Sequence, residues 1–142
     1  MACPYVVPSD DAINKFNEFK IKKTIMAIML NIRRVDGTDQ VVFVKNFFED
    51  SQEKDIINSL PDDEAIYIYR KIYLEEKGEK IIFILYFPRN ARAVKKMIYG
   101  CAYKDINNQL GDIFGAITTD EPSDLFKENI IKKLLHEKYK NS

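Results

Sequence analysis

Apolar residues recur along the chain with two different periods, and turn and cap residues mark where one period gives way to the other. Stretches rich in isoleucine, valine and aromatic residues predict buried or half-buried strands. They cover residues 24–32, 40–47, 65–74, 80–87 and 112–118. Helical spacing of apolar residues predicts four helices, of which the third, 88–110, is the longest. The order α-β-β-α-β-β-α-β-α indicates an α/β protein with a mixed sheet of five or six strands, covered by helices on both faces.

Local turn and cap residues support these boundaries. Ser9 precedes two acidic residues and is expected to cap the first helix. Asp36-Gly37 is typical of a tight hairpin turn between two antiparallel strands. Ser123 is expected to cap the last helix.

The composition is that of an ordinary folded domain. The 22 basic and 22 acidic residues cancel, which disfavours nucleic-acid binding through net charge. A length of 142 residues favours one domain over residues 1–142. Residues 1–8 hold two prolines and no periodic pattern, so we expect a flexible, exposed tail there. No apolar run approaches the length of a membrane span, and a secretory signal is not recognisable, so we expect a cytoplasmic protein.

Few residue combinations suggest catalysis or metal binding. His136 is the only histidine, without the cysteines or buried carboxylate that a metal site or a catalytic triad needs. Cys3 and Cys101 are too few for a disulfide framework, so we expect a reducing compartment, with Cys101 packed in the core. The stretch 111–115 lacks the lysine-serine ending of a phosphate-binding loop. We therefore expect a binding protein, not an enzyme, with no cofactor and no metal.

The third predicted helix carries a local concentration of charge. From Arg89 to Lys104 there are five basic residues and no acidic one. On a helical projection, one face is apolar and is expected to pack on the sheet. It consists of Val94, Met97, Ile98 and Cys101. The opposite face is basic and is expected to meet solvent or a partner. It consists of Arg89, Arg92 and Lys96.

Four stretches resemble motifs of the ADF/cofilin family, whose fold is the actin-depolymerising-factor homology domain. Residues 16–23, FNEFKIKK, resemble the signature FNELKxRK, and residues 60–67 resemble the start of LPxxxxRYxVYD. Residues 87–99 resemble the most specific of the four motifs, WxPDxAxxxxKMxYAS. Residues 119–120 and the helix after them resemble the closing ATDxSE segment. The resemblance extends over nearly the whole chain and implies the same fold as the predicted order.

The resemblance also implies a function and two binding surfaces. An ADF/cofilin protein binds actin monomers and filaments, prefers ADP-actin, and promotes filament severing, depolymerisation and turnover. The first implied surface serves both monomer and filament, and combines the tail with the long helix. It consists of Ala2, Cys3, Pro4, Tyr5, Arg92, Lys95, Lys96, Met97 and Ile98. The second serves filaments only, and consists of Lys77, Lys80, Lys132 and Lys133.

Further expectations concern partners and regulation. The protein should act as a monomer on the actin cytoskeleton, and its basic helix should also bind phosphoinositide head groups. Val94 stands where the family often has arginine, and Gly78 stands where it has a basic residue two places before Lys80. Cys3 stands in place of a regulatory serine, so phosphorylation there is expected to be absent.

Two other functions stay open from the sequence. A protein of the same fold that resembles the glia maturation factors would bind the Arp2/3 complex and debranch actin. Gly100 leaves room for this alternative, whereas the FNEFKIKK stretch favours the ADF/cofilin interpretation. A small enzyme that uses Cys101 as nucleophile is a weaker alternative, because the sequence offers no histidine near it as a base.

Overall fold

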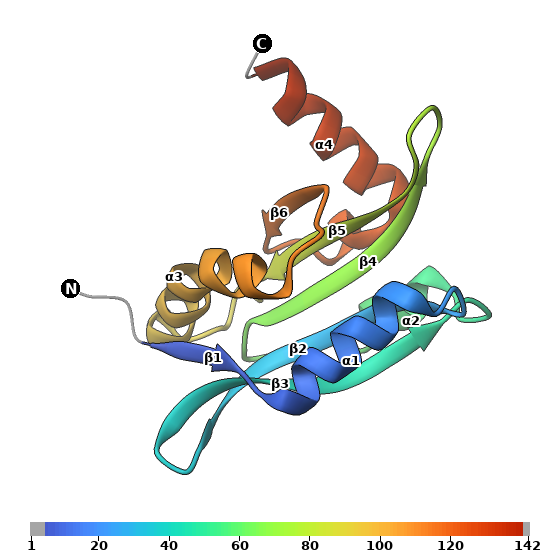
Figure 1. Ribbon diagram of the computed structural model, residues 1–142. Coiled ribbons are helices and arrows are strands. Elements are labelled where there is room, and N and C mark those ends of the chain that lie inside the picture. Colours follow the sequence, from blue (N-terminus) through green and yellow to red (C-terminus); the bar gives the residue numbers. More distant parts are fainter. Residues whose placement is uncertain (1–4, 141–142) are drawn as a thin grey trace.

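The computed structural model describes the backbone of residues 5–140 and the side chains of residues 5–135 (Figure 1). Within this range a six-stranded mixed sheet has the order β1-β3-β2-β4-β5-β6. Its strands are β1 (Val6–Pro8), β2 (Ile25–Val35), β3 (Thr38–Phe48), β4 (Ile66–Leu74), β5 (Gly78–Tyr86) and β6 (Gly115–Thr119). The helices are α1 (Asp10–Ile21), α2 (Glu53–Asn58), α3 (Ala93–Leu110), the 3₁₀-helix η1 (Pro122–Leu125) and α4 (Lys127–Lys140). The expected fold class and element order are confirmed, with β1 and η1 as additions.

Two hairpins form the middle of the sheet, and short parallel strands close its edges. Strands β2–β3 and β4–β5 pair antiparallel, whereas β1 pairs parallel with β3 and β6 parallel with β5. Asp36 and Gly37 both have positive φ, 50° and 80°, as a tight two-residue hairpin turn requires. The predicted turn at these residues is therefore confirmed.

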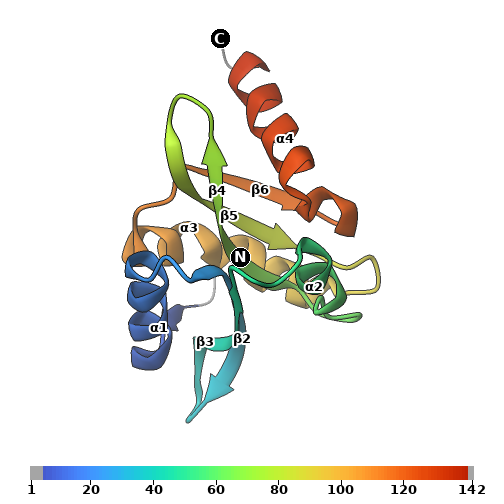
Figure 2. The same cartoon turned by 90° about the vertical axis from the view of Figure 1, so that its right-hand side faces the viewer.

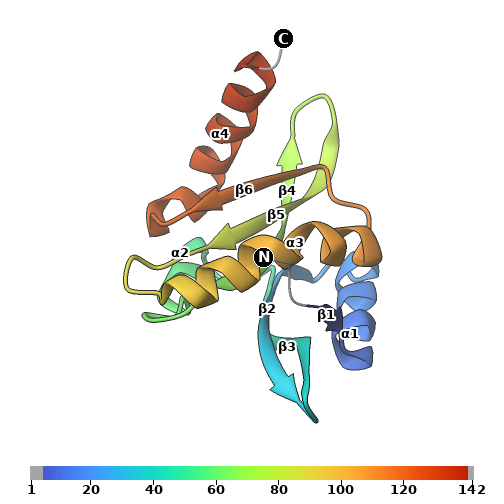
Figure 3. The same ribbon diagram turned by 90° about the vertical axis from the view of Figure 1, so that its left-hand side faces the viewer.

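Helices cover both faces of the sheet, as the sequence predicts. Figure 2 shows α1 and α2 on opposite sides of the strands, and Figure 3 shows α3 crossing in front of them. One core lies between the sheet and helices α1 and α3, and contains Phe16, Tyr67, Phe83 and Tyr99. The other lies under α2, η1 and α4. Because β4 and β5 are buried on both faces, their sequences are nearly continuous apolar runs instead of alternating ones.

The segment expected to be a flexible tail is partly a strand. Val6 and Pro8 are buried, and Val6 belongs to the core between the sheet and α3. β1 is held by parallel pairing with β3, in which Val6 lies opposite Asp39. The expectation is therefore wrong for residues 6–8, because pairing with a strand more than thirty residues away leaves no local pattern in three residues. Residues 1–4 lie outside the described part.

Helices α1 and α4 are capped at their N-termini in different ways. The Ser9 hydroxyl accepts a hydrogen bond from the Ala12 amide at 3.0 Å, so the predicted cap of α1 is confirmed. Ser123 lies inside η1 and does not cap α4, which begins at Lys127. The Lys127 amide instead donates to the Glu53 carboxylate of α2 at 2.8 Å. Glu53, which is distant in sequence, thus caps α4 in place of Ser123.

Glu53 also neutralises a buried arginine. Arg70 of β4 forms an ion pair with Glu53 and donates a second hydrogen bond to the Leu125 carbonyl at 2.5 Å. Desolvation opposes the charge of Glu53, but the hydrogen bonds from Arg70 and Lys127 prevail and lower its pKa. The start of α4 therefore depends on a carboxylate that is ionised at neutral pH.

Helix α3 is held by neutral groups instead. The Tyr99 hydroxyl accepts a hydrogen bond from the Ile32 amide at 2.8 Å, and the Tyr67 hydroxyl donates to the Tyr99 carbonyl at 2.7 Å. The Tyr69 hydroxyl donates to the Asn107 side-chain oxygen at 2.5 Å. Burial raises the pKa of Tyr99 to about 12, so these contacts keep their protons over the whole physiological range.

Candidate functional site

Helix α3 packs through a different face from the expected one. Its buried residues are Tyr99, Ala102, Ile106, Asn107 and Leu110, which lie toward the sheet. Val94 is 52% exposed and Met97 is 37% exposed, so these two members of the stripe expected to pack face outward, whereas Ile98 packs against the core. The expectation is wrong for Val94 and Met97 because α3 carries two apolar stripes. The sheet takes the one that begins with Tyr99, whose ring packs 4.9 Å from that of Tyr67.

Basic side chains flank this outward stripe. Arg92 is exposed, while Lys95 and Lys96 are partly buried and lie between the outward stripe and the packed one. Within residues 5–135, no carboxylate forms an ion pair with any of these three side chains. The first turn of α3 has no acidic residue and Arg92 provides no side-chain cap, so the positive end of the helix dipole adds to the side-chain charges.

The beginning of the described chain joins this region. Strand β1 lies against α3, and Tyr5 directly precedes it with 80% of its surface exposed (Figure 1). The structure thus brings together the described members of the first predicted surface, whereas Ala2, Cys3 and Pro4 lie outside the described residues. We call this region the α3 surface. It consists of Tyr5, Arg92, Val94, Lys95, Lys96, Met97 and Ile98.

The second predicted set lies on the β4–β5 hairpin and on α4. Lys77 and Lys80 both point their ammonium groups at the ring of Phe114, at 4.9 and 6.0 Å from its centroid. Phe114 lies in the loop before β6 and is 43% exposed. Sequence reasoning missed this residue because it placed Phe114 inside the predicted strand 112–118, whereas β6 begins only at Gly115.

Helix α4 adjoins the same region. Gly115 lies so close to α4 that a Cβ atom at that position would be 2.8 Å from Leu134 Cδ2. Figure 1 shows the β4–β5 hairpin and α4 extending from the sheet in the same direction. We call this region the hairpin–α4 surface. It consists of Lys77, Lys80, Phe114, Lys132 and Lys133.

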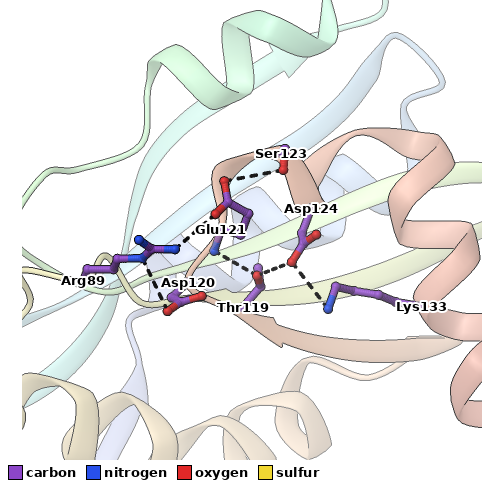
Figure 4. A network of polar contacts seen from close by, with 7 residues as sticks. All are labelled: Arg89, Thr119, Asp120, Glu121, Ser123, Asp124 and Lys133. Carbon is purple, nitrogen blue, oxygen red and sulfur yellow. Dashed lines mark hydrogen bonds and ion pairs between the residues drawn. The ribbon is translucent and has the colours of Figure 1, made fainter.

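Lys132 and Lys133 are not equivalent. Lys132 is exposed, whereas Lys133 forms an ion pair with Asp124 at 3.4 Å (Figure 4). Asp124 in turn accepts a hydrogen bond from the Thr119 hydroxyl at 2.5 Å. Lys133 is therefore partly engaged in holding α4 against the end of β6.

The same network reaches the loop before α3. Arg89 lies ahead of the helix and not on its basic face, which corrects the sequence expectation. Its guanidinium is 3.8 Å from Asp120 and 3.4 Å from Glu121, both of which follow β6 (Figure 4). These three side chains are largely exposed, so the ion pairs contribute little to stability. They do remove Arg89 from the set of unpaired basic residues around α3.

The described residues offer no arrangement typical of catalysis. Cys101 is only partly buried and is disulfide-bonded in the structure, so it is neither a core side chain nor the free thiol that a nucleophile requires. No group of three or more potential metal ligands occurs in the described part of the chain. The backbone of His136 belongs to α4, and its side chain lies outside the described range. None of the helices that the structure describes combines the length and apolarity needed to cross a bilayer.

Fold and surfaces together define a class: a small sheet-and-helix domain with exposed apolar and basic side chains on its surface. The family described as cofilin/tropomyosin-type actin-binding protein matches residues 6–135, and the chain belongs to this family. The resemblance drawn from the sequence motifs is thereby confirmed. The family is defined by actin binding and is not a class of enzymes.

Relatives and solved structures agree with this assignment. The chain is 25% identical to the cofilin of Ogataea parapolymorpha over 134 residues, which cover 91% of this chain and 92% of that protein. It is 23% identical to the glia maturation factor of Drosophila melanogaster over 130 residues, covering 89% and 93%. The crystal structure of Streptomyces griseoflavus cofilin superimposes with a TM-score of 0.76 at 21% identity, covering 91% of this chain and 98% of that one. This last similarity supports the fold.

Proposed function

We propose that the protein is an actin-filament turnover factor that binds actin monomers and filaments and prefers ADP-actin. On binding filaments it promotes severing and depolymerisation. It acts as a monomer in the cytoplasm, on the actin cytoskeleton. The observation that carries the proposal is the outward apolar stripe of α3, flanked by lysines that form no ion pair within residues 5–135.

The α3 surface is suited to bind actin in both of its forms. Val94 and Met97 lie one helical turn apart and offer an apolar ridge for a cleft on the partner. Lys95 and Lys96 lie beside that ridge, where they guide the approach to an acidic surface and fix the register of docking. Because α3 is tied to the sheet by buried tyrosines, the ridge is rigid before binding.

The hairpin–α4 surface supports the filament-specific part of the proposal. It lies on a different side of the domain from the start of α3 (Figures 1 and 3), so the two surfaces can contact two neighbouring subunits of a polymer. A protein that binds both subunits favours the filament twist that suits both contacts. Severing then follows from a shift among filament conformations, without any bond chemistry.

The unpaired basic groups of the α3 surface also favour phosphoinositide head groups as competing ligands. Arg92, Lys95 and Lys96 gather three charges near a helix start that itself attracts anions. We expect vesicles that contain phosphoinositides to displace actin monomers from the protein. Cys3 has no hydroxyl group, so we expect no phosphorylation switch at that position.

Three measurements test the proposal directly. Co-sedimentation with actin filaments should show saturable binding, and titration of fluorescent actin monomers should show tighter binding of the ADP form than of the ATP form. Filament length distributions after mixing should shift to shorter filaments. Absence of binding to both monomers and filaments would refute the proposal.

A second candidate function is debranching through the Arp2/3 complex. It is favoured by the match to a glia maturation factor over 89% of the chain and by the engagement of Lys133 with Asp124, which weakens the filament surface. A pull-down with purified Arp2/3 complex beside actin monomers separates the two functions. Retention of Arp2/3 without any retention of actin would favour this second function over the first.

A further inference from the structure

We propose that Phe114 is a binding residue of the hairpin–α4 surface, where its ring enters an apolar depression on the side of an actin filament. Lys77 and Lys80 then pair with acidic groups around that depression. This inference rests on the proposed function, because it names a specific contact for filament binding. Phe114 belongs to none of the residues expected from the sequence to bind actin.

The ring is exposed although the backbone that carries it is fixed. The Phe114 amide donates a hydrogen bond to the Ile81 carbonyl of β5 at 2.8 Å. The next residue, Gly115, starts β6 and lies directly against Leu134 of α4. The loop is thus held on both sides while 43% of the ring surface remains open to solvent. A large apolar side chain held in place before binding loses little conformational entropy when a partner covers it.

The ring does not serve as core packing. Phe114 appears in neither of the two buried clusters, and within residues 5–135 no ring–ring contact joins it to another aromatic side chain. Its contacts are instead the ammonium groups of Lys77 and Lys80, at 4.9 and 6.0 Å. Cation–π contacts at exposed sites are weak, so a partner's carboxylates can take over the lysines while its apolar groups cover the ring.

The charges around the ring favour an acidic partner. Glu79 and Lys80 are neighbours in β5 and therefore point to opposite faces of the sheet. Glu79 interacts with Lys71 on the far side, so it does not neutralise the lysines beside Phe114. Glu75 and Glu76 belong to the turn at the tip of the hairpin. An apolar ring between two lysines fits a partner with an apolar depression and an acidic rim.

The position of the ring favours the filament over the monomer as its partner. Lys80, which lies over the ring, alternates in step with Ile82, and Ile82 packs in the core under α4, so the ring lies toward the side of the sheet that α4 covers. The α3 surface is the one proposed to engage the monomer. Loss of the ring should therefore weaken filament binding and leave monomer binding unchanged.

The test compares Phe114→Ala with a matched control, Phe48→Ala. Phe48 has the same side chain with 48% of its surface exposed, and it lies on β3, away from both surfaces. Filament co-sedimentation and monomer titration are measured for the wild-type protein and for both variants. We expect Phe114→Ala to weaken filament binding about tenfold, as truncation of a central aromatic anchor does, with monomer affinity unchanged. Phe48→Ala should change neither.

A third variant guards against an unfolding artefact. Phe114→Leu keeps a large apolar side chain and should lose less filament affinity than Phe114→Ala, because part of the apolar contact in the depression is retained. Wild-type filament affinity in Phe114→Ala, or equal losses in Phe114→Ala and Phe48→Ala, would overturn the inference. A wild-type protein that binds monomers but not filaments would overturn it together with the filament part of the proposed function. A larger loss in Phe114→Ala than in Phe114→Leu, with Phe48→Ala unchanged, supports it.

Discussion

The α3 surface and the hairpin–α4 surface consist of similar basic and apolar residues, but within residues 5–135 the basic groups form ion pairs or cation–π contacts only at the second surface. Around α3 the basic side chains have no ion pair among the described residues, and the apolar stripe faces solvent. On the hairpin and α4, Lys77 and Lys80 lie over Phe114, and Lys133 pairs with Asp124. A partner can therefore bind the basic and apolar side chains of the α3 surface directly, whereas at the hairpin–α4 surface it must first replace internal contacts. Under the proposed function, this difference suits a primary contact with every actin subunit and a weaker, more selective contact with the polymer.

The two surfaces also differ in how their helices are held. α3 is fixed by hydrogen bonds among neutral tyrosines, and α4 begins on the carboxylate of Glu53, which also neutralises buried Arg70. Acid should therefore loosen the second surface before the first. The predictions below test this comparison, starting from the largest expected effect.

The double substitution Lys95→Ala with Lys96→Ala should remove most monomer binding. If these partly buried lysines become desolvated against carboxylates of actin, their loss costs on the order of 2–5 kcal/mol of binding free energy. Fluorescence titration of monomeric actin at physiological salt measures the change. An unchanged dissociation constant would mean that the α3 surface does not bind monomers through its charges.

The substitution Glu53→Gln should destabilise the fold by about 1–3 kcal/mol, because Arg70 and the Lys127 amide lose a charged acceptor. Denaturant unfolding at neutral pH measures this. Monomer affinity of the folded variant should stay at the wild-type value, since α3 does not touch Glu53. A loss of monomer binding greater than the loss of folded protein would contradict the separation of the two surfaces.

Acid should act on wild-type α4 in the same direction. The pKa of Glu53 is lowered by folding below its ordinary value of 4.5, so its contribution to stability is complete above that value. The contribution is lost as the pH falls through the lowered, folded-state pKa. Amide hydrogen exchange should then show the start of α4 opening before α3, whose tyrosine hydrogen bonds do not titrate in acid. Equal protection of both helices down to global unfolding would contradict this account.

The substitution Met97→Ala should weaken monomer and filament binding together, by about 1–2 kcal/mol, through loss of apolar contact in the partner's cleft. A matched control is Ile13→Ala on α1, since Ile13 is 36% exposed and Met97 is 37% exposed. Both variants should unfold at similar denaturant concentrations. If Ile13→Ala reduces actin binding as much as Met97→Ala, the outward stripe of α3 is not a specific contact.

The smallest effect is expected from Lys132→Ala, which should weaken filament binding about two- to fivefold and spare the monomer. Lys133→Ala should combine a similar loss with a lower melting temperature, because Asp124 loses its ionic partner. Parallel co-sedimentation and thermal unfolding distinguish the two. Equal loss of monomer and filament binding in Lys132→Ala would argue against separate surfaces.

The order of the elements other than β1 and η1 could be predicted because each of them has a local signature in the sequence. The isoleucine-rich strands, the Asp36-Gly37 turn and the Ser9 cap all act within a few residues. The start of α4 could not be predicted in this way. Its cap comes from Glu53, which is 74 residues away in the chain, whereas local cap residues pointed to Ser123.

Most residues of the two candidate surfaces were named from the sequence, but Val94, Phe114 and the orientation of α3 were not. Met97 and Val94 form a helical stripe that looks like a packing face until the second stripe through Tyr99 and Ile106 is compared with it. Which stripe is buried depends on the rings that the sheet offers to α3, and these come from other strands. Phe114 was missed for the same reason, since its neighbours Lys77 and Lys80 belong to a distant hairpin.

The exposed ring of Tyr5 beside α3 has a practical consequence for spectroscopy. The chain contains no tryptophan, so the protein has no indole emission of its own. A Tyr5→Trp variant would place a single indole at the edge of the proposed monomer contact, where 80% of the native side chain meets water. Its emission wavelength could then report the change in solvent exposure at that one position when a partner binds.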